Sequence, residues 1–165
     1  MIQIANGIKY LNQLGIVYRD LKPSNIMITK QNNFGIIKIA DFGISKIISP
    51  TERTKDGVGT LAYISPEILK RTPYNQKVDI WAMGVILYQI LSDTLPFTRE
   101  NDNDLAKKIA FEELKFDKND WENRTQSVQD LIKCCLNKSQ ERRISIDDFI
   151  NLPWFKKNKI IKLSI

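Results

Sequence analysis

The segment from Lys77 to Leu91 constrains the fold of this chain more than any other. Drawn as a helix, it carries apolar residues almost all the way round instead of on one stripe. These residues are Val78, Ile80, Trp81, Met83, Val85, Ile86, Leu87, Ile90 and Leu91. A helix of this kind must be covered on most of its sides. A chain of 165 residues, of which 42% are hydrophobic, is long enough to supply that cover within a single domain.

Further helices are predicted on both sides of this segment. The chain opens with apolar residues at helical spacing, and Gly15 follows where a C-cap glycine belongs. We also expect helices at about 102–110, 125–136 and 145–151, with Ser145 as the N-cap of the last one.

A small amount of β-structure is predicted near the N-terminus. The β-prone runs 26–28 and 36–39 flank a polar turn at 31–35, which indicates a hairpin. Residues 44–64 lack a sustained period and are predicted to form a long loop, which in a compact domain is usually functional or disordered. The predicted fold class is therefore α+β and predominantly helical.

Composition excludes several classes of protein. The sequence contains no histidine, which rules out histidine triads and zinc–histidine sites, and its adjacent cysteines, Cys134 and Cys135, are expected to be reduced and in or near the core. The net charge is +6, but basic residues are interleaved with acids, so we predict neither a nucleic-acid nor a membrane partner and interpret residues 156–165 as a solvated basic tail. No apolar run approaches the roughly 18 residues of a membrane span, and no signal peptide is recognisable, so the expectation is a soluble cytoplasmic protein.

Two neighbouring loops carry the residue types that magnesium-assisted phosphoryl transfer requires. The motif Tyr-Arg-Asp-Leu-Lys-Pro-Ser-Asn ends at Asn25, before the first β-prone run, and Asp-Phe-Gly begins at Asp41, after the second. We interpret Asp20 as the base or orienting group, Lys22 as the cation on the transferred phosphate, and Asn25 and Asp41 as oxygen ligands of Mg²⁺. Taken singly, each is better explained as a turn former or a solvated side chain. Together they favour a catalytic site.

With several later residues, these motifs resemble the eukaryotic protein kinase family. Residues 18–20, Tyr-Arg-Asp, look like its catalytic-loop triplet with tyrosine in the usual histidine position, and residues 41–43 look like its metal-binding Asp-Phe-Gly. The triplet Ser-Pro-Glu that ends at Glu67 is similar to the family's Ala-Pro-Glu. Asp79 opens a stretch similar to the family's central buried helix, and Arg143 matches the arginine that pairs with the glutamate of that triplet.

The resemblance covers residues 1–155 and corresponds to the larger, C-terminal lobe of the kinase fold. It implies ATP and Mg²⁺ as cofactors, proteins with serine or threonine acceptors as substrates, and Met27 and Ala40 at the adenine pocket. The smaller N-terminal lobe, with its glycine-rich loop, strand lysine and helix glutamate, has no counterpart in this sequence. We therefore expect an exposed apolar surface that a protein partner covers, and negligible phosphotransfer by the isolated chain.

Finer resemblances point to one branch of the family. Asp-Leu-Lys-Pro around Lys22 and Gly-Thr-Leu-Ala-Tyr around Thr60 resemble serine/threonine kinases, in which this threonine would hydrogen-bond toward Asp20 and Lys22. Asp-Phe-Gly-Ile-Ser-Lys and the closing Leu-Pro-Trp-Phe at 152–155 resemble calcium/calmodulin-dependent and calcium-dependent protein kinases. No EF-hand loop follows residue 155, so direct calcium binding is not predicted.

Regulatory residues are also implied by the resemblance. Arg19 and Lys46 resemble the basic residues that receive an activation-loop phosphate and order that loop. The position that usually accepts the activation-loop phosphate holds Asp56. Because its carboxylate is permanently charged and can partly substitute for phosphate, we expect activity without phosphorylation at this position. Thr54 is a candidate phosphorylation site; the alternative interpretation is a solvated loop hydroxyl.

The sequence leaves two functions from different classes. The first is a serine/threonine protein kinase. The second is a shortened, non-catalytic pseudokinase that binds substrates or another kinase as a scaffold. Retention of Asp20, Lys22, Asn25 and Asp41 together favours the kinase, because a scaffold has no physical need for them.

Overall fold

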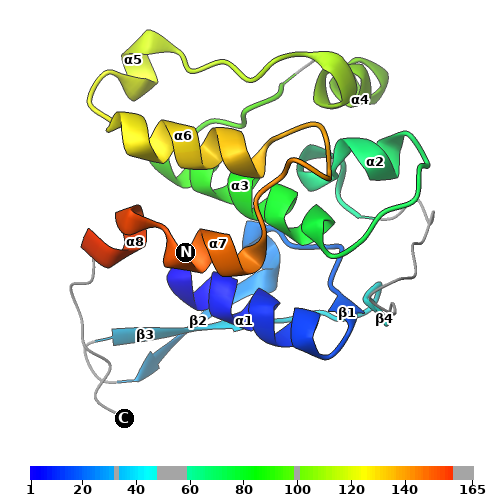
Figure 1. The fold of residues 1–165 in the computed structure, drawn as a ribbon, viewed down its shortest axis with the longest axis vertical. Coiled ribbons are helices and arrows are strands. Elements are labelled where there is room, and N and C mark those ends of the chain that lie inside the picture. Colours follow the sequence, from blue (N-terminus) through cyan, green and yellow to red (C-terminus); the bar gives the residue numbers. More distant parts are fainter. Residues whose placement is uncertain (32–33, 48–58, 99–100, 158–165) are drawn as a thin grey trace.

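The computed structural model describes residues 1–31, 34–47, 59–98 and 101–157 (Figure 1). Its helices are α1 (Ile2–Gln13), α2 (Pro66–Leu69), α3 (Lys77–Ser92), α4 (Asp102–Phe111), α5 (Lys118–Trp121), α6 (Gln126–Cys135), α7 (Ile146–Asn151) and α8 (Pro153–Lys157), with 3₁₀ turns η1 (Pro23–Asn25) and η2 (Leu61–Tyr63). Its strands are β1 (Ile16–Val17), β2 (Ile26–Gln31), β3 (Phe34–Ile39) and β4 (Lys46–Ile47), paired antiparallel as β1–β4 and β2–β3. The predominantly helical α+β class is confirmed.

Helix α3 forms the centre of the helical body, between α6 and the pair α1 and α7 (Figure 1). Every residue from Val78 to Tyr88 is buried, as the apolar pattern predicts. Gly84 allows α6 to approach closely, because a Cβ atom at that position would lie 2.6 Å from Cβ of Cys135. The buried core therefore surrounds α3 on most sides.

Helix α1 carries the hairpin that positions the candidate site. Its end is marked by Gly15, whose φ of 72° is the left-handed conformation expected of a C-cap glycine. Near its start, the amide of Gln3 donates to the carbonyl oxygen of Gly35 (3.1 Å) and accepts from the backbone N–H of Ile37 (2.8 Å). This pair of hydrogen bonds fixes strand β3 against α1.

The predicted long loop is only partly irregular. Lys46–Ile47 forms strand β4 and pairs with β1, so the prediction of a loop was wrong there, and Leu61–Tyr63 forms η2. Residues 48–58 lie outside the described part of the chain. Two-residue strands have no periodicity of their own, and their pairing partner lies about thirty residues away in the sequence.

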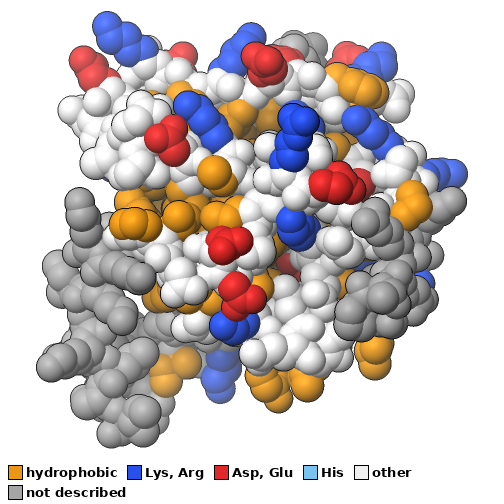
Figure 2. All heavy atoms as spheres, in the orientation of Figure 1, with side chains coloured by type: hydrophobic (Ala, Val, Ile, Leu, Met, Phe, Trp, Pro, Cys, Tyr) orange, Lys and Arg blue, Asp and Glu red, His pale blue; other side chains and the backbone are white. Residues whose placement is uncertain are grey.

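Surface charge, helix length and the cysteines bear on the compositional predictions. On the face drawn in Figure 2, lysine and arginine side chains are interspersed with acidic ones. Among the described helices, none combines the length and the apolar character that crossing a membrane requires. Both cysteine thiols are free; burial raises the pKa of Cys135, whereas Cys134, predicted in or near the core, is exposed.

Candidate active site

The loop between β1 and η1 is hydrogen-bonded to a buried carboxylate of helix α3, that of Asp79. Oδ2 of Asp79 accepts the backbone N–H of Tyr18 (2.9 Å), and Oδ1 accepts that of Arg19 (2.8 Å). Burial raises the pKa of Asp79 to about 6, against the lowering effect of these two hydrogen bonds. Arg19 adopts a left-handed φ of 72°, uncommon for a residue with a side chain. Asp79 therefore fixes the turn from which Asp20 projects.

Tyr18 joins this loop to the Asp-Phe-Gly segment. Its hydroxyl donates to the carbonyl oxygen of Ala40, and its ring meets Phe42 edge-on with 5.3 Å between centroids. Burial is the main reason that the pKa of Tyr18 is raised to about 12, so this hydroxyl stays protonated and able to donate at neutral pH. The backbone N–H of Ala40 donates to the carbonyl oxygen of Asn25 (2.9 Å), a second link between the two loops.

Four of the predicted site residues meet around one carboxylate. Oδ1 of Asp20 accepts the hydroxyl of Thr60 (2.9 Å), and Oδ2 lies 2.8 Å from Nζ of Lys22 and accepts Nδ2 of Asn25 (3.0 Å). Lys22 also donates to the Thr60 hydroxyl (2.8 Å). Residues separated by as many as 40 positions in the sequence are thus in direct contact.

The electrostatics of this cluster keep Asp20 ionised. Burial acts to raise its pKa, but hydrogen bonds from Lys22, Thr60 and Asn25 outweigh burial and hold the pKa below its ordinary value. The carboxylate is therefore charged at neutral pH and presents acceptor oxygens at a partly open surface. Such a group can orient a hydroxyl and receive its proton.

The predicted metal ligands lie at one margin of the β2–β3 hairpin. Ile26 pairs with Ile39 in the ladder, so Asn25 and Asp41 flank the same end of the two strands. Asp41 is exposed, has a φ of 62°, and accepts the backbone N–H of Gly43 at Oδ1 (3.1 Å).

The donor chemistry of this margin suits a nucleotide-bound magnesium ion. Among the described residues, no group of three or more histidine, cysteine or acidic side chains could hold a metal by itself. Mg²⁺ often uses one or two protein oxygens and fills its other positions with water and phosphate oxygens, which fits one amide and one carboxylate. Met27, the predicted adenine contact, is 56% exposed on β2, and Ala40 is half-buried at the end of the hairpin.

The predicted regulatory residues are only partly described. Arg19 donates from Nε to the carbonyl oxygen of Ile44 (2.6 Å) and from a terminal nitrogen to the hydroxyl of Tyr74 (3.2 Å), while Lys46 is half-buried in β4. Thr54 and Asp56 lie outside the described residues. The contact with Tyr74 was not predicted, because nothing in the sequence near that tyrosine indicates it.

The predicted ion pair between distant parts of the body is present. Arg143 donates to both carboxylate oxygens of Glu67, at 2.6 and 2.9 Å, with the two side chains almost fully buried. It also donates to the carbonyl oxygens of Lys77 (2.9 Å) and Asn137 (3.2 Å). This arginine therefore ties α2, α3 and the segment after α6 together.

A comparison with known families agrees with this geometry. The family model described as the protein kinase domain matches residues 1–155, which is most of the chain. Protein kinase domains use ATP and Mg²⁺ to phosphorylate protein substrates. The chain therefore belongs to the protein kinase family.

Proposed function

We propose that this protein transfers the γ-phosphate of ATP to serine and threonine hydroxyls of protein substrates. The observation that carries the proposal is the position of Thr60, whose hydroxyl bridges Oδ1 of Asp20 (2.9 Å) and Nζ of Lys22 (2.8 Å). A lysine and a threonine at these positions resemble the serine/threonine branch of the family. This bridge supports the proposal that the acceptor hydroxyl of a protein substrate binds beside Asp20.

Each residue of the cluster has a distinct role in the proposed reaction. Asp20 orients the acceptor hydroxyl and takes up its proton as the phosphoryl group is transferred, and Asn25 fixes the carboxylate through Nδ2 (3.0 Å). Lys22 compensates negative charge on the transferred phosphate. Asn25 and Asp41 would hold Mg²⁺, which neutralises the phosphate oxygens of ATP when bound.

Residues 1–155 form, in this proposal, the larger lobe of a kinase domain, with 156–165 as a basic tail. Support comes from apolar side chains exposed along the hairpin and the segments that follow it. They are Met27 (56%), Ile28 (70%), Ile36 (39%), Phe42 (49%) and Ile47 (75%). Several large apolar side chains exposed in one part of the chain favour a site of interaction. We expect it to be covered by the element that closes the adenine pocket over Met27 and Ala40, in the same protein or in a partner.

Substrate selection is proposed to avoid a strong arginine requirement. Relatives that select basic substrates often carry glutamate where this chain has Ser24, and sometimes where it has Gln89. The side-chain oxygen of Gln89 accepts the hydroxyl of Tyr63 (2.9 Å), and Lys22 lies close enough to Tyr63 to affect its pKa. The positions of Ser24 and Gln89 therefore carry neutral polar side chains instead of carboxylates. Strong arginine selection in a positional peptide array would contradict this proposal.

The subgroup and regulation are proposed from the family resemblance, and the location from the composition of the sequence. We place the protein near the calcium/calmodulin-dependent and calcium-dependent kinases and, as an ATP-dependent enzyme with free thiols, in the cytoplasm. Arg19 and Lys46 are proposed to receive an activation-loop charge, supplied by Asp56 or by phosphorylated Thr54.

The decisive experiment is a phosphotransfer assay with Mg²⁺ and radiolabelled ATP. Two proteins are compared: the 165-residue chain and the chain with any in-frame coding sequence that precedes Met1. We expect the longer protein to label serine and threonine peptides, and the 165-residue chain to show negligible activity. Asp20→Ala should reduce kcat by about 10²–10⁴-fold. Unchanged activity in Asp20→Ala, or labelling of tyrosine, would contradict the proposal.

The exposed apolar side chains also favour a second candidate, a non-catalytic scaffold that binds substrates or another kinase. A scaffold would bind its partner through these side chains equally well in Asp20→Ala and Asp41→Asn, and no form of it would transfer phosphate. The kinase requires both carboxylates. The same assay therefore separates the two functions.

A further inference from the structure

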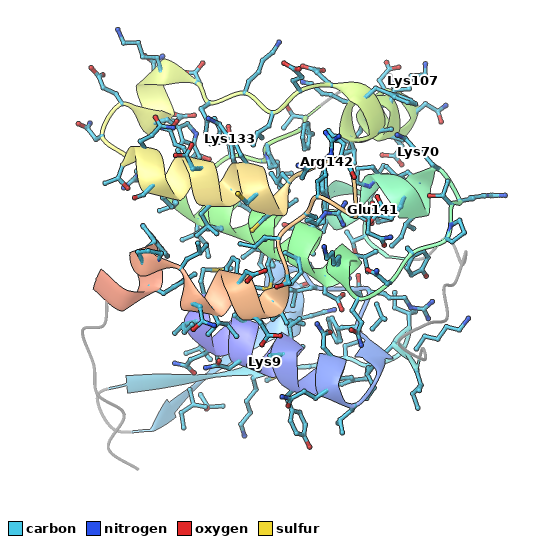
Figure 3. The ribbon with its side chains drawn as sticks, in the orientation of Figure 1. Lys9, Lys70, Lys107, Lys133, Glu141 and Arg142 are labelled. Atoms are coloured by element: carbon cyan, nitrogen blue, oxygen red, sulfur yellow. The ribbon has the colours of Figure 1, made fainter. Side chains whose placement is uncertain are left out.

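Two lysines on the side of the molecule away from the β2–β3 hairpin lie near each other without a carboxylate partner. Lys70 is the C-cap of α2, and Lys138 follows α6. Within the described ranges 1–31, 34–47, 59–98 and 101–157, neither forms an ion pair. In contrast, the other lysines labelled in Figure 3 have carboxylate oxygens nearby: Lys9 at 2.7 Å, Lys107 at 3.5 Å and Lys133 at 3.5 Å.

Aromatic rings hold both of these ammonium groups in place. Nζ of Lys70 lies 4.6 Å from the centre of the Phe111 ring. Nζ of Lys138 lies 3.9 Å from the centre of Phe97 and 5.0 Å from that of Trp81. A cation over a ring face is attracted electrostatically but keeps its charge and its hydrogens. The rings position the two charges without neutralising them.

Lys138 is further fixed by the end of helix α4. It donates to the carbonyl oxygens of Ile109 (2.6 Å) and Lys108 (3.4 Å), which accounts for two of the three ammonium hydrogens. Burial, followed by the charge of Lys70, lowers the pKa of Lys138 to about 8, although the carboxylate of Glu112 acts in the opposite direction. The repulsion between the two cations is therefore part of the folded structure, and a bound anion would relieve it.

A small cavity lies between the two lysines. Its volume is 180 Å³, and its lining includes Lys70, Lys138, Ser139, Thr72 and Glu141. Pockets that enclose drug-sized ligands measure about 300–1,000 Å³, so this one suits a single small group. Two carboxylates also line the cavity: Glu67, which is paired with Arg143, and Glu141, which accepts the Ser139 hydroxyl at 3.1 Å and has further interactions of its own.

We propose that this cavity binds a phosphate group between Lys70 and Lys138, either as a phosphorylated side chain of a protein or as the free ion. Figure 3 shows Lys70, Glu141 and Arg142 on the same side of the molecule, where the segment after α6 approaches α2. A bound phosphate group would place its negative charge between the two fixed ammonium groups and accept charge-assisted hydrogen bonds from them. The site is separate from the Asp20 cluster, and its test does not depend on phosphotransfer.

The test is calorimetric titration of the 165-residue chain at constant ionic strength, with three probes. These are inorganic phosphate, a phosphoserine tripeptide with blocked ends, and the same tripeptide unphosphorylated. We expect saturable binding of the first two and none of the third. Tighter binding of the phosphopeptide than of phosphate identifies a phosphorylated protein as the source, and equal binding identifies the free ion. Absence of saturable binding by both would overturn the proposal.

Variants decide whether the cavity is the site. Lys70→Met should weaken binding about tenfold, as loss of one charge-assisted contact predicts. The matched control Lys107→Met removes an exposed lysine that has its own carboxylate, and should change the affinity less than twofold. Glu141→Gln should tighten binding, because it removes the competing charge. Lys138→Met is also informative if thermal unfolding shows that it folds. Equal losses in Lys70→Met and Lys107→Met would show general surface attraction and overturn the proposal.

Discussion

Two charged clusters of this protein, one around Asp20 and one formed by Glu67 and Arg143, join distant parts of the chain in opposite environments. In the Asp20 cluster, the side chains of Lys22 and Asp20 are 24% and 13% exposed. In the Glu67–Arg143 pair, the carboxylate is 7% exposed and the guanidinium 0%. The buried pair can only hold the fold together, since no substrate can reach it. The open cluster contributes less to stability but leaves oxygen atoms available for chemistry.

The physical origin of this difference is solvent screening. An exposed ion pair contributes about 0–1 kcal/mol, because water screens the charges and ordering the side chains costs entropy. A buried pair that loses one partner leaves an uncompensated charge in a medium of low polarity, which is far more costly. Substitutions in the two clusters should therefore separate stability from activity.

The largest effect is expected for Arg143→Ala. It leaves the Glu67 carboxylate buried without a partner and removes donors to two backbone carbonyls, so we predict a loss of about 3–5 kcal/mol in the free energy of unfolding. Urea denaturation measures this directly. The control Arg142→Ala changes the exposed neighbouring arginine and should cost less than about 0.5 kcal/mol. Similar losses in both variants would show that the burial of Arg143 is not what makes it important.

A smaller effect is expected at Asp79, which is buried like Glu67 but supports the open cluster. Its pKa is about 6 in the folded protein against 3.8 in the unfolded chain, so the folded state binds the proton more tightly. The stability contributed by protonation is fully present below pH 3.8 and is lost as the pH rises through 6. Relative to Asp79→Asn, the wild type should therefore gain up to about 3 kcal/mol as the pH falls from 7 to 4.

Urea denaturation of both proteins at several pH values tests this, since groups common to both cancel in the difference. Asp130→Asn, which removes an exposed carboxylate of α6, is the matched control. A wild type that gains stability relative to Asp79→Asn as the pH rises would contradict this prediction. It would mean that the hydrogen bonds from Tyr18 and Arg19 favour the charged carboxylate more strongly than burial disfavours it.

Much of the fold could be predicted because its long elements carry a period. Helix α3 is apolar all round, the hairpin lies between two β-prone runs, and Ser145 caps α7 by accepting the backbone N–H of Asp148 (3.1 Å). Elements of two to five residues, such as β4 and α5, are too short for a period to show. Their conformations depend on what they pack against, so they emerge only in the folded chain.

The membership of the candidate site was predictable from the sequence, but its geometry was not. The motifs place Asp20, Lys22, Asn25 and Thr60 together by family resemblance, and their contacts agree with that expectation. The left-handed turn at Arg19, by contrast, depends on a carboxylate 60 residues away accepting its amide. Long-range backbone contacts of this kind leave no local pattern.

The smallest effect on stability is expected for Thr60. Its hydroxyl lies at an exposed position, so Thr60→Val should change the free energy of unfolding by less than about 1 kcal/mol. In the active protein we expect the same variant to lower kcat, because Asp20 and Lys22 lose the group that bridges them, whereas Thr60→Ser keeps the hydroxyl and should keep most of the activity. Urea denaturation and the phosphotransfer assay measure the two effects separately. Two results together would contradict this prediction: a clear loss of stability in Thr60→Val, and a kcat in Thr60→Ser as low as that of Thr60→Val. Thr60 would then act through packing and not through its hydroxyl, and the contrast between an open chemical cluster and a buried structural pair would not hold.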